Sequence, residues 1–182
     1  MATLTGAIGY PQATSVTVAY SSTAPLKIAL GTRARDAAGN EYVYVNFDAA
    51  KAVGELVTFD TDYLATACGA ATVGYVGIVC GEASSSDRAG WVQVYGINTN
   101  CVANSGLTSG FLTVAATTDG YSVPAIAGTI TTDITYAIVG MNAVTSASTA
   151  TSPGMSSLAS SILGVFTARL NYPYVDVRVA TS

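Results

Sequence analysis

The sequence predicts an all-β protein, built as a β-sandwich or a small β-barrel of short antiparallel strands, with an extended N-terminal arm. About ten to twelve short runs of β-branched and aromatic residues recur at intervals of roughly 8–12 residues. Clusters of Gly, Asn, Asp and Ser separate these runs, and there is little helical periodicity. The chain has 182 residues, which is enough for one sizeable β-domain.

The first half of the chain divides into an arm and a series of strands. Residues 1–24 contain no charged residue and are predicted to form the arm, with one edge strand in it. Residues 25–182 are predicted to form a single β-domain. Its first strands are expected at 26–30, 41–47 and 55–59, with a loop at 31–40 that ends in a turn at 38–40, and a helical turn at 48–53.

The clearest pair of strands lies at residues 73–80 and 91–95. They flank a polar segment at 82–90, which is typical of a hairpin. Because successive strand residues point to opposite faces, Trp91 and Tyr95 share one face of the second run and its two valines share the other. One face of the hairpin is therefore expected to enter a core, and the other to present tyrosines and Trp91 at a surface.

The second half of the chain is predicted to contain more strands and one long loop. Residues 96–109 are turn-rich, and strands are expected at 100–103, 110–116, 121–126, 136–141, 162–170 and 174–180. The Asp119-Gly120 pair is a strong turn signal before the third of these strands. A Ser/Thr/Ala-rich tract at about 143–161 is expected to be a long surface loop.

Charge is scarce throughout the chain. Only 10% of residues are charged, against about a quarter in ordinary soluble domains. Because free monomers use charge for solubility, this surface is expected to be covered by partners or by copies of the chain. The alternative is an extracellular β-protein with a polar, neutral surface.

The same features exclude several classes of partner. A net charge of −4 argues against nucleic-acid binding, which needs clustered Lys and Arg. No run of 18 apolar residues is present, so no membrane span is predicted. The first residues lack the features of a signal peptide, and a cytoplasmic start is expected.

Reactive side chains are few. Histidine is absent, which rules out Ser-His-Asp and Cys-His nucleophile systems and His-based zinc sites. The cysteines at 68, 80 and 101 form no metal-ligand spacing and are expected to be small buried thiols. No catalytic residue, cofactor or metal site is predicted.

A hydrolase that uses Asp60, Asp62 or Glu82 is a minor alternative. The Asp60-Thr61-Asp62 run lacks the continuation of a calcium-binding loop, so it is interpreted as a polar turn after a strand.

Tyrosine is abundant, with 11 copies. Tyr and Trp rings stack on sugars, and they also anchor protein interfaces. Few acidic or amide side chains accompany the tyrosines, which favours the interface. The candidate interface residues are Tyr10, Pro11, Tyr20, Tyr75, Asp87, Arg88, Trp91, Tyr95, Tyr172 and Tyr174.

Several short motifs resemble those of the capsid cement, or head decoration, proteins of tailed bacteriophages. They are GELV at 54–57, TVGYVGIV at 72–79 and GWVQVYG at 90–96. The ending, with IVGMNA at 138–143 and YVDVRV at 174–179, is similar to the terminal hairpin of many phage surface proteins. The resemblance covers about residues 54–103 and 134–180. The uncharged arm, the tract at 143–161 and the cysteines depart from that pattern.

The resemblance implies a small β-domain that sits on the capsid lattice in trimers. The expected function is therefore that of a non-enzymatic virion structural protein, which binds the outside of an assembled phage capsid and stabilises it. Its expected partners are the major capsid protein and other copies of itself, with the arm and the tract at 143–161 providing adhesion. The alternative is a glycan- or receptor-binding head fibre or appendage, in which Trp91 stacks on sugar rings.

Overall fold

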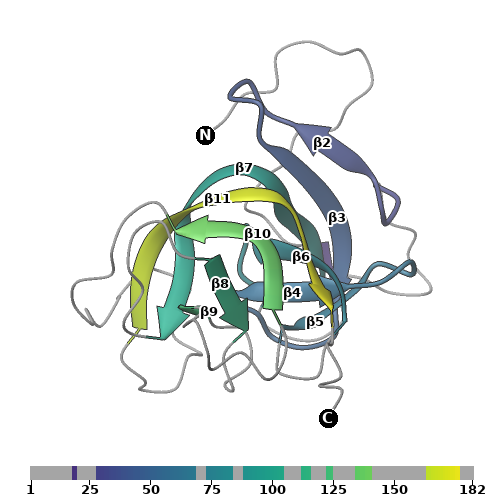
Figure 1. Cartoon of the computed structure of the whole chain (residues 1–182). Coiled ribbons are helices and arrows are strands. Elements are labelled where there is room, and N and C mark those ends of the chain that lie inside the picture. Colours follow the sequence, from purple (N-terminus) through teal and green to yellow (C-terminus); the bar gives the residue numbers. More distant parts are fainter. Residues whose placement is uncertain are drawn as a thin grey trace.

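The computed structural model describes residues 18–19, 28–68, 73–83, 88–104, 112–115, 122–124, 134–140 and 163–176. Over these residues the protein is all-β, as predicted, with strands and no helix (Figure 1). Eleven strands belong to one mixed sheet. The strands are β1 (Val18–Ala19), β2 (Arg33–Arg35), β3 (Glu41–Phe47), β4 (Leu56–Phe59), β5 (Leu64–Ala67), β6 (Gly74–Val79), β7 (Arg88–Asn104), β8 (Leu112–Ala115), β9 (Ser122–Pro124), β10 (Ile134–Gly140) and β11 (Leu163–Asp176).

The first half of the sheet closes on itself as a small barrel. Strand β3 pairs with β5 and with β7, β5 pairs with β4, β4 with β6, and β6 with β7. All of these pairs are antiparallel except β3 with β5, which is parallel. The predicted hairpin is present, because Ile78 and Val79 of β6 face Gln93 and Val92 of β7. A closed ring leaves its strands without an open edge.

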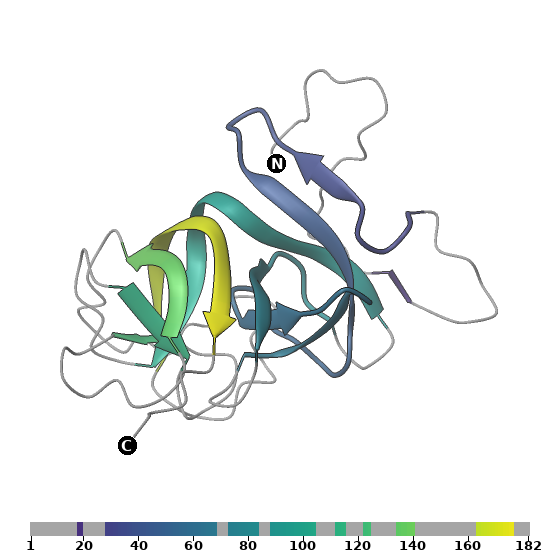
Figure 2. The same cartoon turned by 45° about the vertical axis from the view of Figure 1, so that its right-hand side comes forward.

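A second ring of strands shares β7 with the first. Strand β7 pairs with β11, β11 with β10, β10 with β8, β8 with β9, and β9 in parallel with β7. Figures 1 and 2 show β7 and β11 running together as a long arch above the other strands of this ring. The end of β11 reaches the first ring, where Tyr174 pairs with Tyr75 of β6. The two rings are therefore joined through β7, β11 and β6.

Strand β7 serves both rings because it bends at Gly96, which has φ of +99°. The side chain of Gln93 donates hydrogen bonds to the carbonyl oxygens of Tyr95 and Ile97 at 3.1 and 3.2 Å. Its Oε1 accepts a 2.8 Å bond from the amide of Asn98. These bonds satisfy buried polar groups beside the point where the pairing of β7 with β3 becomes irregular and ends, which stabilises the bend.

The interior of the first ring is a core of valines and aromatic residues. The strand predicted at 41–47 is present as β3, and its Val43, Val45 and Phe47 point into this core. Tyr44 lies on the opposite face, with Trp91 at a ring-centroid distance of 5.0 Å. Ile28 and Leu30 pack over this outer face, so β3 and the first part of β7 are buried on both sides.

Several predictions about individual elements are wrong. Residues 28–30 form no strand, whereas β2 lies inside the predicted loop at 31–40. The turn at 38–40 is present, with Gly39 at φ of +85°. No helical turn occurs at 48–53, where Lys51 instead forms a bridge with Ala83, and β5 is an additional strand. The two strands predicted at 91–95 and 100–103 are both parts of the single strand β7. The two strands predicted at 162–170 and 174–180 likewise both overlap the single strand β11.

Other predictions concern residues that are only partly described. Within the arm, Val18 and Ala19 form the expected edge strand against Arg88 and Ala89 of β7. Tyr10, Pro11, Tyr20, Asp87 and the tract at 143–161 lie outside the described residues. Of the cysteines, Cys68 and Cys101 are buried as predicted, and Cys80 is half-buried.

Candidate aromatic binding surface

Exposed aromatic and aliphatic side chains gather on three neighbouring strands. We call this set the aromatic band; its members are Tyr75 on β6, Tyr95 and Ile97 on β7, and Tyr172 and Tyr174 on β11. Each is between 39% and 54% exposed. Large apolar side chains exposed together on one surface are typical of a binding site, whereas isolated ones are common on any protein.

The rings of the band contact one another in pairs. Tyr75 and Tyr174 are cross-strand partners, and their rings meet edge to face with centroids 5.5 Å apart. Tyr95 and Tyr172 stack with centroids 5.2 Å apart and an interplanar angle of 28°. Because each ring restricts the rotamers of its neighbour, the band presents a preorganised surface that loses little side-chain entropy on binding.

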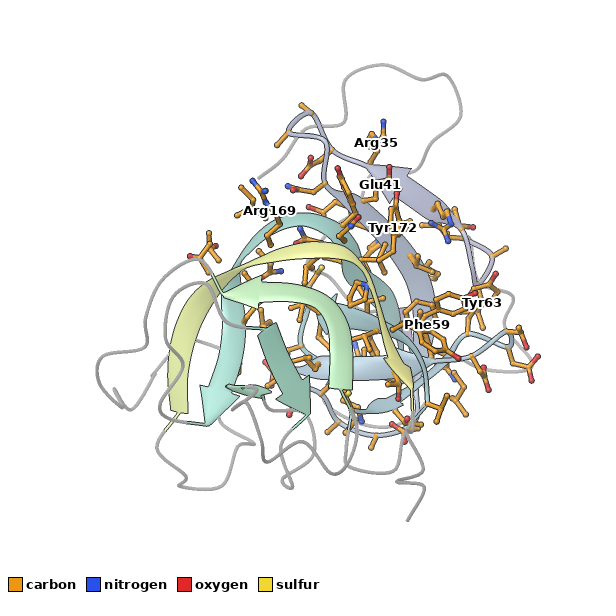
Figure 3. All side chains as sticks on the ribbon, viewed as in Figure 1. Arg35, Glu41, Phe59, Tyr63, Arg169 and Tyr172 are labelled. Atoms are coloured by element: carbon orange, nitrogen blue, oxygen red, sulfur yellow. The ribbon has the colours of Figure 1, made fainter. Side chains whose placement is uncertain are left out.

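Tyr172 is fixed in place by polar contacts as well. Its backbone adopts φ of 49°, a left-handed conformation that is unusual for a residue with a large side chain. Its phenol donates a 2.6 Å hydrogen bond to Oε2 of Glu41, and Arg35 forms an ion pair with Oε1 of the same carboxylate. Figure 3 shows Tyr172 pointing toward Glu41 and Arg35 at the edge of the barrel. The pKa of the Tyr172 phenol is raised, mainly because of its hydrogen bond to Glu41 and to a smaller extent because of burial.

A hollow of about 540 Å³ adjoins the band between the β2–β3 turn and the bend in β7. Tyr95, Gly96 and Ile97 line one side, and Asn40 and Arg169 are also in its lining. The Oδ1 atom of Asn40 accepts a 3.0 Å hydrogen bond from the backbone N–H of Ile97. A β-carbon at Gly96 would collide with this Asn40 side chain, so glycine is required for the close approach.

Asp36 organises the turn that carries Asn40. Its Oδ1 accepts bonds of 2.9 Å from the N–H groups of Ala38 and Asn40, and its Oδ2 accepts bonds from Asn40 Nδ2 and the phenol of Tyr42. Burial alone would raise the pKa of Asp36, but these hydrogen bonds outweigh it and the net pKa lies below the usual value. Asp36 is thus an ionised structural hub whose acceptor sites are occupied.

A second cavity, of about 450 Å³, opens at the mouth of the first ring. Phe59, Tyr63, Tyr75 and Tyr172 contribute aromatic rings to it, and Asp60 lies beside them. Phe59 stacks near Tyr63 with centroids 6.4 Å apart and lies 6.0 Å from Tyr75. Figure 3 shows Phe59 and Tyr63 next to each other at this mouth. Two tyrosines of the band therefore also belong to the cavity.

The structure separates the sequence-predicted interface residues into two groups. Tyr75, Tyr95, Tyr172 and Tyr174 are exposed and lie together. Trp91 is only 2% exposed, so its placement at a surface is wrong. Its face of β7 is covered by β2 and by residues 28–30, which the sequence did not place there. Arg88 is half-buried at the start of β7.

Sequence reasoning missed several members of the site. Phe59 and Tyr63 were not singled out, although they flank the Asp60-Thr61-Asp62 turn. That run is a polar turn, as predicted, in which the N–H of Asp62 bonds to Oδ1 of Asp60. Ile97 was not singled out because the predicted strand ended at residue 95, although alternation continued by two residues places Ile97 on the same face as Tyr95.

Burial perturbs an acid and a thiol in the described part of the chain. No group of three Cys, Asp or Glu side chains there is placed to hold a metal ion. Burial raises the pKa of Glu55, but this carboxylate already accepts the N–H of Ala52 and is 8% exposed. Burial also raises the pKa of Cys80 to about 12, which disfavours a reactive thiolate.

This chain matches no protein-family model, no curated protein and no solved structure. In the residues that the structure describes there is no helix of the length and hydropathy needed to cross a bilayer.

Proposed function

We propose that this protein is a non-enzymatic virion structural protein, which binds the outer surface of an assembled phage capsid and stabilises it. The observation that carries the proposal is the aromatic band, a preorganised row of exposed rings on a protein with few charges. The capsid as the occupant follows from the resemblance of residues 54–103 and 134–180 to phage cement proteins.

The chemistry of the band favours a protein partner. Tyr residues are enriched at the centres of protein interfaces, where a flat ring buries a large area and its hydroxyl still finds a hydrogen bond. Tyr95 and Ile97 flank a hollow of about 540 Å³, which provides space for a side chain of the partner. A protein bound in this way stabilises a shell because it binds the assembled state and not the dissociated one.

The rigid body behind the band fits a mechanical role. Strand β7 runs without interruption through both rings, and β11 pairs with it from Leu163 to Asn171. A load applied to the band is therefore distributed over many hydrogen bonds. We further propose that the protein acts as a trimer, which the resemblance implies.

The test is co-sedimentation with purified shells of the phage that encodes this chain. The double variant Tyr95→Ser/Ile97→Ser removes two members of the band, and we expect binding at least about tenfold weaker, since truncated interface anchors cost about 1–2 kcal/mol each. The control is Leu64→Ser on β5, which is 43% exposed and outside the band, and it should bind normally. Unchanged binding by a folded double variant would refute the role of the band, and a purified monomer that decorates shells would refute the trimer.

A further inference from the structure

The cavity at the mouth of the first ring is a formed pocket. Its floor consists of Val43, Val76 and Val94, which belong to three different strands of the barrel. Its volume of about 450 Å³ falls within the range of small-molecule sites, about 300–1,000 Å³. Barrel mouths are common places for such sites, because the ring fixes the wall residues relative to one another.

The surface that a ligand would touch is aromatic and polar. The valine floor is at most 4% exposed, so it contributes almost no accessible area. The accessible wall is made by Tyr63, Tyr75 and Tyr172, with Arg33, Asp60 and Thr61 among them. This composition suits a ligand that has a flat C–H face and many hydroxyl groups.

The backbone of the pocket is strained at two of its tyrosines. Tyr63 and Tyr172 have φ of 59° and 49°, and among the described residues they are the only non-glycine residues with positive φ. Tyr63 is fixed by a 2.9 Å bond from the N–H of Asn46 to its carbonyl oxygen, and its ring packs against Gly31, where a β-carbon would collide with it. Such strain is concentrated at ligand-binding sites, where it preorganises the contacting groups.

We propose that this pocket binds a neutral sugar ring of a glycan. The C–H face of the ring stacks on the tyrosines. The Asp60 carboxylate accepts hydrogen bonds from the sugar hydroxyls, and Arg33 donates to their oxygens. Arg33 forms no ion pair with any residue that the structure describes. One positive and one negative side chain line the pocket, which favours a neutral ligand over an anion.

This inference does not depend on attachment to a capsid. Tyr95 and Ile97, which test the aromatic band, are absent from the lining of the pocket, and Tyr63 and Asp60 are absent from the band. Trp91, the sequence-based candidate for sugar stacking, is buried and takes no part. Failure of one proposal therefore leaves the other intact.

The experiment is a screen of the full-length protein against an array of immobilised neutral and acidic glycans, followed by titration of the best free oligosaccharide. Tyr63→Gly removes a ring while retaining a residue that tolerates positive φ, and Asp60→Asn retains the oxygen that caps the turn. We expect each variant to weaken binding at least about tenfold. The control Asp62→Asn, whose side chain is absent from the lining of the pocket, should bind as the unmodified protein does.

Three results would overturn the proposal. The first is the absence of saturable binding to any neutral glycan on the array. The second is binding that persists unchanged in Tyr63→Gly and Asp60→Asn. The third is a preference for acidic glycans or for octanoate, used as an amphipathic anion, over every neutral sugar. Thermal unfolding of each variant verifies that the pocket variants are folded.

Discussion

The phenol of Tyr172 donates a 2.6 Å hydrogen bond to Oε2 of Glu41, which lies 131 positions earlier in the sequence. This bond connects the left-handed turn in β11 to the first residue of β3. It places Tyr172 where the aromatic band and the barrel-mouth pocket meet. Both proposed surfaces therefore depend on the same long-range contact.

Replacement of Tyr172 by Phe should lower the free energy of unfolding by about 0.5–1.5 kcal/mol, because the ring remains and one hydrogen bond is lost. Burial raises the pKa of Glu41, but the bonds from Tyr172 and Arg35 outweigh it and the net pKa is lowered. The contribution of Glu41 to the free energy of unfolding is thus present above its pKa in the unfolded chain. It is lost as the pH falls through its pKa in the folded protein. Urea unfolding at pH 7 and pH 3 should show a smaller loss of stability on acidification in Tyr172→Phe. Tyr95→Phe, which keeps its stacked ring, is the control.

Replacement of Asp36 by Asn should cost about 1–3 kcal/mol at pH 7, because Oδ2 accepts from both Asn40 and Tyr42 and an amide nitrogen there cannot. The folded pKa of Asp36 is lowered, so its contribution is complete above the unfolded pKa of about 3.9 and declines as pH falls further. The stability difference between the two proteins should therefore shrink between pH 5 and pH 2. A constant difference would contradict the ionised hub, and Asp62→Asn is the matched control.

Two glycines with similar backbone angles should respond differently to alanine. Gly39 and Gly54 have φ of +85° and +89°, but a β-carbon at Gly39 meets nothing within 4 Å, whereas at Gly54 it collides with the carbonyl oxygen of Asn100. Gly39→Ala should cost about 1–2 kcal/mol from the left-handed conformation alone. Gly54→Ala should cost more than about 3 kcal/mol, because β7 cannot move away without breaking its pairing. Chemical denaturation followed by circular dichroism gives both values.

Truncation of Trp91 to Ala should destabilise the protein by about 3–5 kcal/mol, as expected for a buried aromatic residue. Tyr75→Ala, at a position 54% exposed, should cost far less. Since Trp91 is the only tryptophan, the native protein should show the blue-shifted fluorescence of a buried indole, and the shift should be lost on unfolding. Emission typical of water-exposed indole in the folded protein would contradict the observed burial.

Much of the fold follows from local patterns in the sequence. Runs of β-branched and aromatic residues located β3, β4 and β6 to within about one residue, and Gly39 marked the turn before β3. These patterns succeed because strand geometry fixes which side chains share a face. The exposure of Tyr75 and Tyr95 followed from the same rule.

Long-range pairing was beyond the reach of these patterns. Gly96 and Pro173 resemble strand breakers in the sequence, yet β7 and β11 continue through them. Neighbouring strands pair with both β7 and β11, and the Gln93 amide donates a hydrogen bond to the backbone carbonyl oxygen of Tyr95 beside Gly96. Trp91 has the same alternation as Tyr95, but the packing of β2 and of residues 28–30 over its face makes it buried.

By itself, therefore, the sequence determined that the chain is all-β, that charge is scarce, and which short segments are strands. The tertiary structure alone decided that the strands close into two rings, that Trp91 is buried, and that Tyr63 and Tyr172 meet at one pocket. The physical reason is that strand residues alternate locally, whereas ring closure and the covering of a face depend on contacts between segments far apart in the chain.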